Sequence, residues 1–441
     1  MRRRLLLLAL LALLVPLVTA GCGGDDDGEA DGDTAPAADG EGVSGEIAVM
    51  AVWTGPEQEA FQAVLDGFTE ANPDVTVNYT SAGDQLPTQL ATAVEGGNPP
   101  DLAVLPQPGL MADFAEQGAL VPLDFAASEI EENLGESAIE IGTVDDTLYG
   151  FLFKAANKST VWYNVAAFED AGVEPPETWD DFLAAAETLE ASGVPAYSIG
   201  GADGWTLTDL FENIYLRSAG PDMYDQLSRH EIPWTDDSVT EALTLMGEIL
   251  GDTGNIAGGT QGALQTDFPT SVTQVFSDPP EAAMVIEGDF VGGVIADSTE
   301  AEPETGYNVF EFPSIEDSAP SIVVGGDTVV MFEDSPAAQA LVRYLTTTEA
   351  AQIWAERGGF ASLNRGLDPS VYPDPISQTT AGALSGAETV RFDLSDLQPA
   401  EFGGTVGQGL FKLFQDFLRN PDDVDGIAQQ MEDAAAQAFG E

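Results

Sequence analysis

The sequence predicts an α/β fold with two lobes, and two observations indicate it. Over residues 45–105, short runs rich in β-branched residues alternate with amphipathic segments in the order strand, helix, strand, helix, strand. This order is typical of a parallel sheet whose faces are covered by helices. The body that follows the N-terminal segment has about 400 residues, and 44% of the chain is hydrophobic, which suits two cores better than one.

Each expected element follows from its own pattern and its stop signals. Thr54-Gly55-Pro56 ends the first strand, and Asn72-Pro73 ends the first helix. Apolar runs predict strands at 45–53, 75–79, 102–105, 151–158, 161–164, 282–286 and 322–324. Helical spacing predicts helices at 57–70, 86–94, 179–191, 206–219, 238–251 and 336–356.

Two strand ends mark the first candidate binding residues. In open α/β sheets, ligands bind beyond the carboxyl ends of the strands. Trp53 and Thr54 follow the first strand, and Gln107 follows the strand at 102–105. We therefore expect these three residues to line a ligand site.

The first 21 residues have the pattern of an export signal. Arg2-Arg3-Arg4 precedes an apolar run from Leu5 to Val18, which is too short to span a bilayer. Small residues then lead to Cys22, the single cysteine of the chain. This pattern resembles the lipobox of bacterial lipoproteins, in which the cysteine is lipidated, although Thr19 stands where leucine is usual. Plain secretion with an incidental thiol is the alternative.

Residues 22–44 predict a disordered acidic tether behind the lipidated cysteine. Apart from Val43, this segment contains no large aliphatic or aromatic residue, so it has little apolar surface to bury. No later stretch has the length and apolar character of a membrane span. The protein is thus expected to be exported and held at the outer face of the cell membrane by its lipid.

The charge of the chain excludes some partners. With 76 acidic residues against 13 Lys and Arg, the formal net charge is −63. Phosphates would be repelled, so nucleic acid is excluded as a partner and an anionic ligand is disfavoured. Acid excess with only three lysines is similar to the surfaces of proteins from salty habitats, where salt screens the repulsion. A generally acidic proteome is the other explanation.

A series of short motifs resembles the extracellular solute-binding proteins of ABC-type sugar importers, the maltose-binding-like family. Each motif alone is weak, but their order and spacing are specific, and the likeness covers nearly all of the chain after the tether. From Gly325-Gly326-Asp327 to Arg357-Gly358-Gly359-Phe360, the sequence is most similar to the α-glucoside-binding branch. The motifs are Trp53-Thr54-Gly55, Asn98-Pro99-Pro100-Asp101, Asp146-Thr147-Leu148-Tyr149-Gly150, Val161-Trp162-Tyr163-Asn164, Glu177-Thr178-Trp179-Asp180-Asp181-Phe182, Ala282-Ala283-Met284, Glu287-Gly288-Asp289-Phe290 and Gly325-Gly326-Asp327.

The resemblance implies a type II periplasmic-binding-protein fold, in which each lobe is a mostly parallel sheet flanked by helices and several strands form the hinge. It implies an N-terminal lobe at 45–153 and 314–356, and a C-terminal lobe at 154–313 and 357–441. We expect a monomer that delivers a neutral mono- or oligosaccharide to permease subunits. No Walker-type loop is present, so the ATPase would be a separate chain.

Further ligand-binding residues are expected at strand ends and on the hinge. Trp205 follows a glycine-rich loop at 200–204, and an aromatic face suits the apolar C–H face of a pyranose. Trp162, Trp179 and Trp354 are interpreted as core residues instead. The other candidates are Asn157 and Lys158 on the hinge, Glu287, Gly288, Asp289 and Phe290 after the strand at 282–286, and Gly326 and Asp327 after the strand at 322–324.

Other functions have less support in the sequence. A cell-surface glycoside hydrolase could use two carboxylates, but nothing distinguishes a catalytic pair among the 76 acidic residues. His230 is the single histidine, which gives little support to catalytic mechanisms and zinc sites that need histidine side chains. Calcium or peptide binding would leave the tryptophans at strand ends unexplained. We expect no enzyme activity, no catalytic residues, no metal and no cofactor.

Overall fold

The computed structural model describes residues 43–387 and 389–440. The predicted signal peptide, Cys22 and nearly all of the predicted tether lie outside these residues. No helix in the described part of the chain has the length and apolar character needed to cross a membrane.

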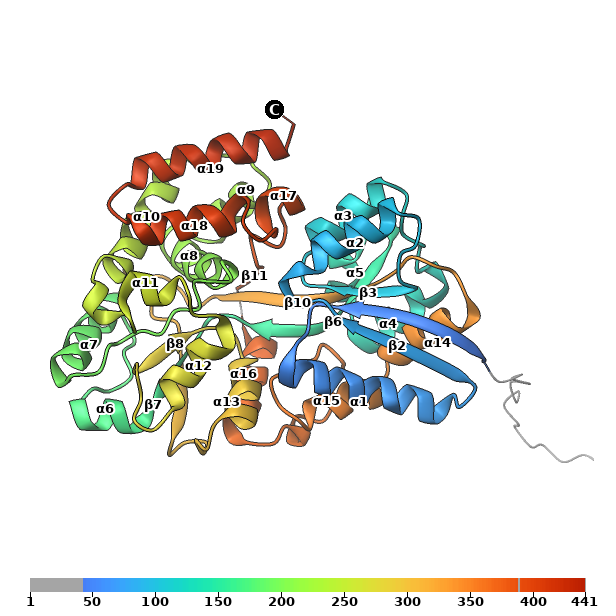
Figure 1. Cartoon of the computed structure of the whole chain (residues 1–441), viewed down its shortest axis with the longest axis horizontal. Coiled ribbons are helices and arrows are strands. Elements are labelled where there is room, and N and C mark those ends of the chain that lie inside the picture. The colour runs from blue at the N-terminus through green and yellow to red at the C-terminus, as the bar shows by residue number, and fades with distance from the viewer. Residues whose placement is uncertain (1–42, 388, 441) are drawn as a thin grey trace, which may run out of the picture. The chain divides into compact units, whose positions relative to one another are not determined.

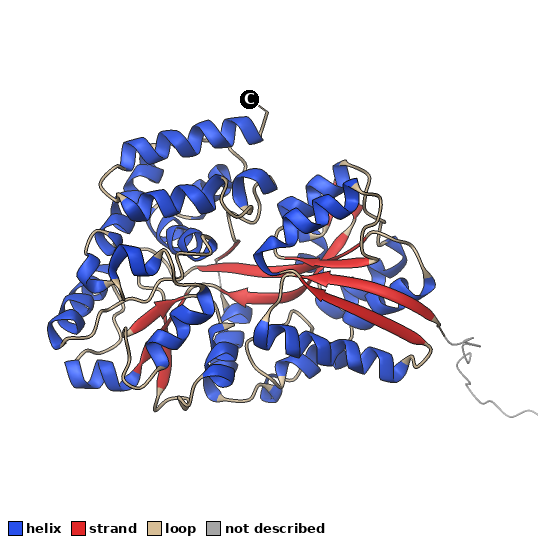
Figure 2. Ribbon diagram, viewed as in Figure 1, coloured by secondary structure: helices blue, strands red, loops and turns tan. Residues whose placement is uncertain are grey.

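A six-stranded mixed sheet forms the centre of the first lobe (Figure 2). Its strands are β1 (Gly45–Ala51), β2 (Val75–Ser81), β3 (Leu102–Leu105), β6 (Gly150–Asn157), β10 (Ile322–Met331) and β11 (Val390–Phe392). The order is β11-β10-β3-β1-β2, and β6 also pairs with β10. β1 is parallel to both β2 and β3, with Ala51 opposite Val104, so the carboxyl ends of β1 and β3 meet at one edge as predicted.

Helices cover this sheet, and their apolar faces make the first core. Phe61 and Phe68 of α1 pack with Leu341 of α14 and Trp354 of α15, and all four side chains are buried. The first-lobe helices are α1 (Gly55–Ala71), α2 (Leu86–Glu95), α3 (Pro108–Glu116), α4 (Ala127–Leu134), α5 (Glu136–Ile141), α14 (Pro336–Leu345), α15 (Thr348–Ala355) and α16 (Pro375–Gly386). A small hairpin joins β4 (Thr143–Val144) to β5 (Thr147–Leu148).

The second lobe has a three-stranded sheet of order β8-β7-β9. Its strands are β7 (Thr160–Asn164), β8 (Met284–Ile286) and β9 (Tyr307–Glu311), and both pairings are antiparallel. The two-lobed α/β fold is therefore confirmed, but the expectation of a mostly parallel sheet in this lobe is wrong. A run of helices, rather than one crossover helix per strand, separates β7 from β8, so the strands need not run the same way.

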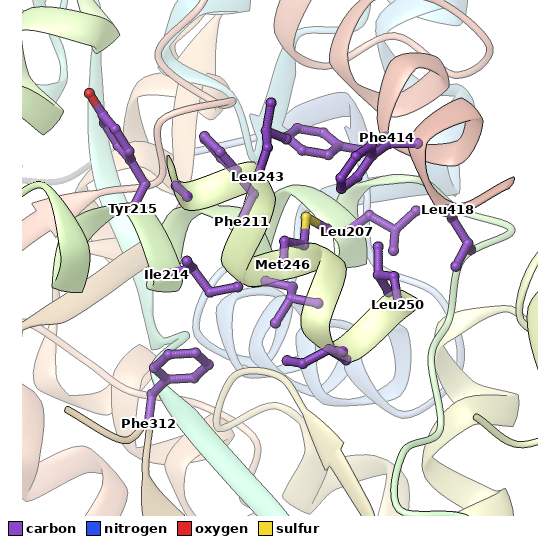
Figure 3. Packing of buried hydrophobic residues seen from close by; sticks show 14 of the residues in the cluster. Leu207, Phe211, Ile214, Tyr215, Leu243, Met246, Leu250, Phe312, Phe414 and Leu418 are labelled. Atoms are coloured by element: carbon purple, nitrogen blue, oxygen red, sulfur yellow. The ribbon is translucent and has the colours of Figure 1, made fainter. Parts of the chain in front are cut away.

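Helices supply most of the second core. The second-lobe helices are α6 (Val165–Ala171), α7 (Trp179–Ser192), α8 (Trp205–Ser218), α9 (Pro221–Ser228), α10 (Asp237–Leu250), α11 (Gly259–Ala263), α12 (Phe268–Phe276), α13 (Val291–Ser298), α17 (Ala400–Gly403), α18 (Gly409–Arg419) and α19 (Val424–Ala438). Figure 3 shows α8, α10 and α18 packing through Leu207, Phe211, Ile214, Leu243, Met246, Leu250, Phe414 and Leu418. The C-terminal segment thus packs with α8, 200 residues earlier in the sequence.

The predicted elements match the observed bounds closely, with one difference. The strand expected at 322–324 continues to Met331, because Gly325 and Gly326 keep an extended backbone and pair with Ala156 and Ala155 of β6. The helices expected at 336–356 are α14 and α15, and the second begins where the Thr347 side chain accepts a hydrogen bond from the backbone N–H of Ala350.

The chain passes between the two cores at three places. Ala155 belongs to the first core and Val161 to the second; Val323 belongs to the second and Val329 to the first. Phe392 and Leu394 form the third such pair. We call residues 155–161, 323–329 and 392–394 the crossing segments, and in Figure 1 the strands β6 and β10 lie side by side where two of them pass. The lobe boundaries inferred from the sequence stay a prediction.

Candidate functional site

A cavity of about 320 Å³ lies between residues of the two cores. Eight residues predicted from the sequence line it, namely Trp53, Thr54, Gln107, Lys158, Trp205, Phe290, Gly326 and Asp327. Trp53 and Thr54 follow β1 and Gln107 follows β3, so the parallel pairing of these strands brings the three residues to one wall. The volume lies at the lower end of the range that small-molecule sites occupy.

Three aromatic side chains of the second lobe form one wall. The ring of Trp205 lies 5.2 Å from that of Phe268 and 5.9 Å from that of Phe290, and the last two rings lie 5.2 Å apart. We call Trp205, Phe268 and Phe290 the aromatic triad. Trp205 is partly exposed, so the triad offers an apolar surface to the cavity.

Trp205 is the first residue of α8, not part of a loose loop. Gly204 before it has φ of +90°, which glycine adopts without strain, and a side chain there would collide with Phe411. The glycine-rich loop before Trp205 is closely packed, since a side chain on Gly200 or Gly201 would also meet neighbouring atoms.

Lys154 on β6 joins the first-lobe wall to the aromatic triad. Its ammonium lies 2.5 Å from Glu57 and 3.6 Å from Asp327, and 5.3 Å from the centre of the Phe290 ring. Burial lowers the pKa of Lys154, but the two carboxylates outweigh burial and the net pKa is raised. Lys154 therefore stays charged, and its charge is already balanced by protein groups.

Lys158, which also lines the cavity, is paired in the same way. Its ammonium lies 3.1 Å from Asp209 and 2.5 Å from Asp393, and 5.6 Å from the centre of the Trp205 ring. Asp396 is also within 4.0 Å. Both lysines of the cavity are thus neutralised by neighbouring carboxylates.

Three further carboxylates line the cavity without a basic partner. Asp84 comes from the first lobe, and Asp203 and Asp267 come from the second. The ion pairs in residues 43–387 and 389–440 include none of them. Burial, opposed by a backbone hydrogen bond from Phe268 and aided by the charges of Asp84 and Asp267, raises the pKa of Asp203 to about 6. The cavity as a whole carries excess negative charge.

Trp53 lines the cavity but has little free surface. Its ring is 2% exposed and packs on Phe61 at 4.6 Å and on Trp354 at 4.7 Å. The indole N–H donates a 3.0 Å hydrogen bond to Asp327. Trp53 therefore shapes the wall through Asp327 more than it offers a stacking face. Trp162, Trp179 and Trp354 are buried, as the sequence predicted.

Four expected binding residues are not among those that line the cavity: Asn157, Glu287, Gly288 and Asp289. Asn157 and Asp289 bond to each other, through the Asn157 backbone N–H to a carboxylate oxygen at 3.3 Å and the Asp289 N–H to the Asn157 carbonyl at 3.1 Å. Glu287 is buried beside a separate small cavity. Phe290, which also follows β8, does line the cavity, so only part of the segment after this strand reaches it.

Sequence reasoning missed several lining residues, among them Glu57, Asp84, Lys154, Asp203, Asp267, Phe268, Asp393 and Asp396. Lys154 could have been found, since it is one of three lysines and lies on the expected hinge strand. The carboxylates gave no signal among 76 acidic residues. In the described part of the chain, no group of three or more His, Cys, Asp or Glu side chains is placed to hold a metal ion.

Comparison with known families decides what this architecture belongs to. The family described as bacterial extracellular solute-binding protein matches residues 53–352, which is most of the chain. The chain belongs to this family. Its members are transport proteins, so the resemblance found in the sequence is confirmed.

Two curated relatives are similar to this solute-binding protein over most of their length. The osmoprotective compounds-binding protein GgtB of Synechocystis is 36% identical over 384 residues, which cover 84% of this chain and 89% of GgtB. The α-glucosides-binding periplasmic protein AglE of Rhizobium meliloti is 32% identical over 380 residues, which cover 83% of this chain and 81% of AglE.

Solved structures share the fold at lower identity. The bacterial solute receptor AcbH, with a preference for β-D-galactopyranose, superposes with a TM-score of 0.79 at 21% identity. The match covers 90% of this chain and all of AcbH. A chitin oligosaccharide binding protein superposes with a TM-score of 0.77 at 19% identity. That match covers 90% of this chain and all of the chitin oligosaccharide binding protein. These structures support the two-lobed fold, not a particular ligand.

Proposed function

We propose that this solute-binding protein captures a small neutral α-glucoside in the cavity between its lobes and delivers it to an ABC permease. The observation that carries the proposal is the cavity wall, where the aromatic triad lies next to carboxylates that have no basic partner. The rings can take the apolar face of a pyranose, and the carboxylates can accept hydrogen bonds from its hydroxyl groups.

The charge of the cavity supports a neutral ligand over an anionic one. Lys154 and Lys158 are each neutralised by at least two carboxylates, so neither is free to balance a phosphate or a uronate. Asp84, Asp203 and Asp267 would repel such a ligand further. The eight predicted residues that line the cavity are proposed as ligand contacts, with Asp203 and Phe268 added to them.

The two curated relatives suggest which neutral solutes to test. AglE is named for α-glucosides and GgtB for osmoprotective compounds. An osmoprotective solute also agrees with the acid excess of this chain, which is similar to that of proteins from salty habitats. The ligand is therefore proposed to be an α-glucoside that also serves as an osmoprotectant.

Delivery to the permease would take place at the membrane. Cys22 is proposed as the lipid anchor and the segment up to residue 44 as the tether, with the protein acting as a monomer. The ATPase would be a separate chain, as the missing Walker-type loop implies.

A thermal-shift panel tests the proposed ligand class. Maltose, trehalose, sucrose, palatinose and glucose are compared with glucose 6-phosphate as an anionic counterpart of glucose. A ligand at 100 times its dissociation constant adds ~2.7 kcal/mol of stability, so a true ligand raises the melting temperature clearly. Stabilisation by glucose 6-phosphate and by none of the neutral sugars would contradict the proposal. Release of p-nitrophenol from p-nitrophenyl α-glucoside would instead support the hydrolase alternative.

A further inference from the structure

Lys158 lies where the three crossing segments come together. It belongs to the first segment, directly after β6. Its backbone N–H donates a 2.9 Å hydrogen bond to the carbonyl of Val323 at the start of the second segment. Its ammonium lies 2.5 Å from the carboxylate of Asp393, which is in the third. Lys158 thus contacts all three crossing segments.

The aliphatic part of the Lys158 side chain also packs closely against the second crossing segment. A side chain on Gly325 of β10 would collide with the Cε of Lys158, so the stem of the lysine lies directly over this glycine. The next residue contacts the same segment, since the Ser159 hydroxyl accepts a 2.9 Å hydrogen bond from the Val323 N–H. The position of Lys158 relative to the second crossing segment is therefore set by close packing in addition to charge.

The same ammonium reaches the wall of the cavity. It bonds Asp209 of α8 at 3.1 Å and lies 5.6 Å from the centre of the Trp205 ring at the start of that helix. Burial lowers the pKa of Lys158, but Asp209, Asp393 and Asp396 raise it to well above the usual value. These carboxylates therefore favour the charged form of Lys158.

We infer that Lys158 is the positioning residue of the hinge, because its ammonium and stem join the three crossing segments to α8 and so fix Trp205 relative to both lobes. We call Lys158, Val323, Gly325, Asp393 and Asp209 the Lys158 junction. Val323 packs with α8 in the second core, whereas Val324 and Val329, on either side of Gly325, pack in the first. A change of the angle between the lobes would therefore shift Gly325 against the Lys158 stem. The junction thereby links closure of the lobes to the position of the aromatic triad. This consequence for binding rests on the proposed function, whereas the mechanical link does not.

The test compares two lysine-to-methionine changes. Methionine keeps an unbranched apolar stem and removes the charge. Lys158→Met removes the junction, and Lys412→Met, on the exposed face of α18, removes a surface lysine paired with Asp416. Because Lys158→Met leaves Asp393 buried and unpaired, the double variant Lys158→Met/Asp393→Asn is made as well.

Two measurements on the ligand-free protein decide the result. Urea unfolding is followed by tryptophan fluorescence and by circular dichroism, and the radius of gyration is measured by small-angle scattering. Wild type and Lys412→Met should unfold in one transition with coinciding midpoints. The double variant should fold but unfold in two transitions, with a larger radius of gyration, because each lobe keeps its own core while the link is weakened.

A double variant with one transition and the wild-type radius of gyration would overturn the inference. So would a double variant that does not fold, because the junction would then be needed within a lobe and not between lobes. Neither readout uses a sugar, so the inference can hold even if every sugar of the panel fails to bind. If the panel does give a ligand, the double variant should bind it more weakly than Lys412→Met does.

Discussion

The indole nitrogen of Trp53 donates a 3.0 Å hydrogen bond to the carboxylate of Asp327, 274 residues later in the chain. The bond joins the end of β1 to β10, and Lys154 lies 3.6 Å from the same carboxylate. Trp53 thus positions a charged group of the cavity while its own ring is buried. This relationship was not visible in the sequence, where Trp53 was expected only to line a ligand site.

Replacing Trp53 with phenylalanine should remove this hydrogen bond and lower stability. A hydrogen bond to a charged group contributes about 1.5–3 kcal/mol, in addition to the packing lost with the smaller ring. Trp234→Phe is the matched control, because Trp234 is fully buried and its indole N–H has no partner in the described structure. Urea unfolding should show a larger loss for Trp53→Phe, and equal losses would contradict the assigned role of the bond.

Stability should fall as the pH rises from about 4 to about 7. Burial raises the pKa of both Asp209 and Asp289 to about 7, although Lys158 and Lys154 oppose the shift. In this interval the folded protein holds protons that the unfolded chain has already released, so raising the pH costs stability. Asp289→Asn should reduce the slope, and an unchanged slope would show that Asp289 does not titrate there.

Salt should raise the melting temperature. The formal charge of −63 makes like charges repel across the surface, and the Debye length shrinks to about 3 Å at 1 M salt. Calorimetric scans between low and molar potassium chloride should show a rise that flattens as screening becomes complete. A melting temperature that stays constant over this range would leave the halophilic interpretation without support.

Cys22→Ala should change where the protein is found. If the cysteine is lipidated, the variant appears in the medium or remains in the membrane as unprocessed precursor. Detergent phase partitioning with immunodetection distinguishes these outcomes from the anchored wild type. Unchanged partitioning of the variant as a mature-sized protein would contradict the lipoprotein prediction.

Local patterns were enough to predict most of the first lobe. The strand-end rule found Trp53, Thr54 and Gln107 because β1 and β3 are parallel and their ends share an edge. Of the candidates after β8, Phe290 lines the cavity and Glu287 and Asp289 do not. The sequence did not reveal that β8 lies in an antiparallel sheet. Asp393 reaches Lys158 from 235 residues away. Such a pairing depends on the third crossing segment, which has no local pattern of its own.

Binding by the Trp205→Ala variant tests the central claim most directly. Isothermal titration with the best sugar of the panel is compared for wild type, Trp205→Ala and Trp234→Phe, a control in the second core away from the cavity. The loss of the indole removes contact area that hydrogen bonds to hydroxyl groups cannot replace, so affinity should fall by ~2 kcal/mol or more, at least about 20-fold. Trp234→Phe should bind as wild type does. Wild-type affinity in a folded Trp205→Ala protein would contradict the proposed sugar site.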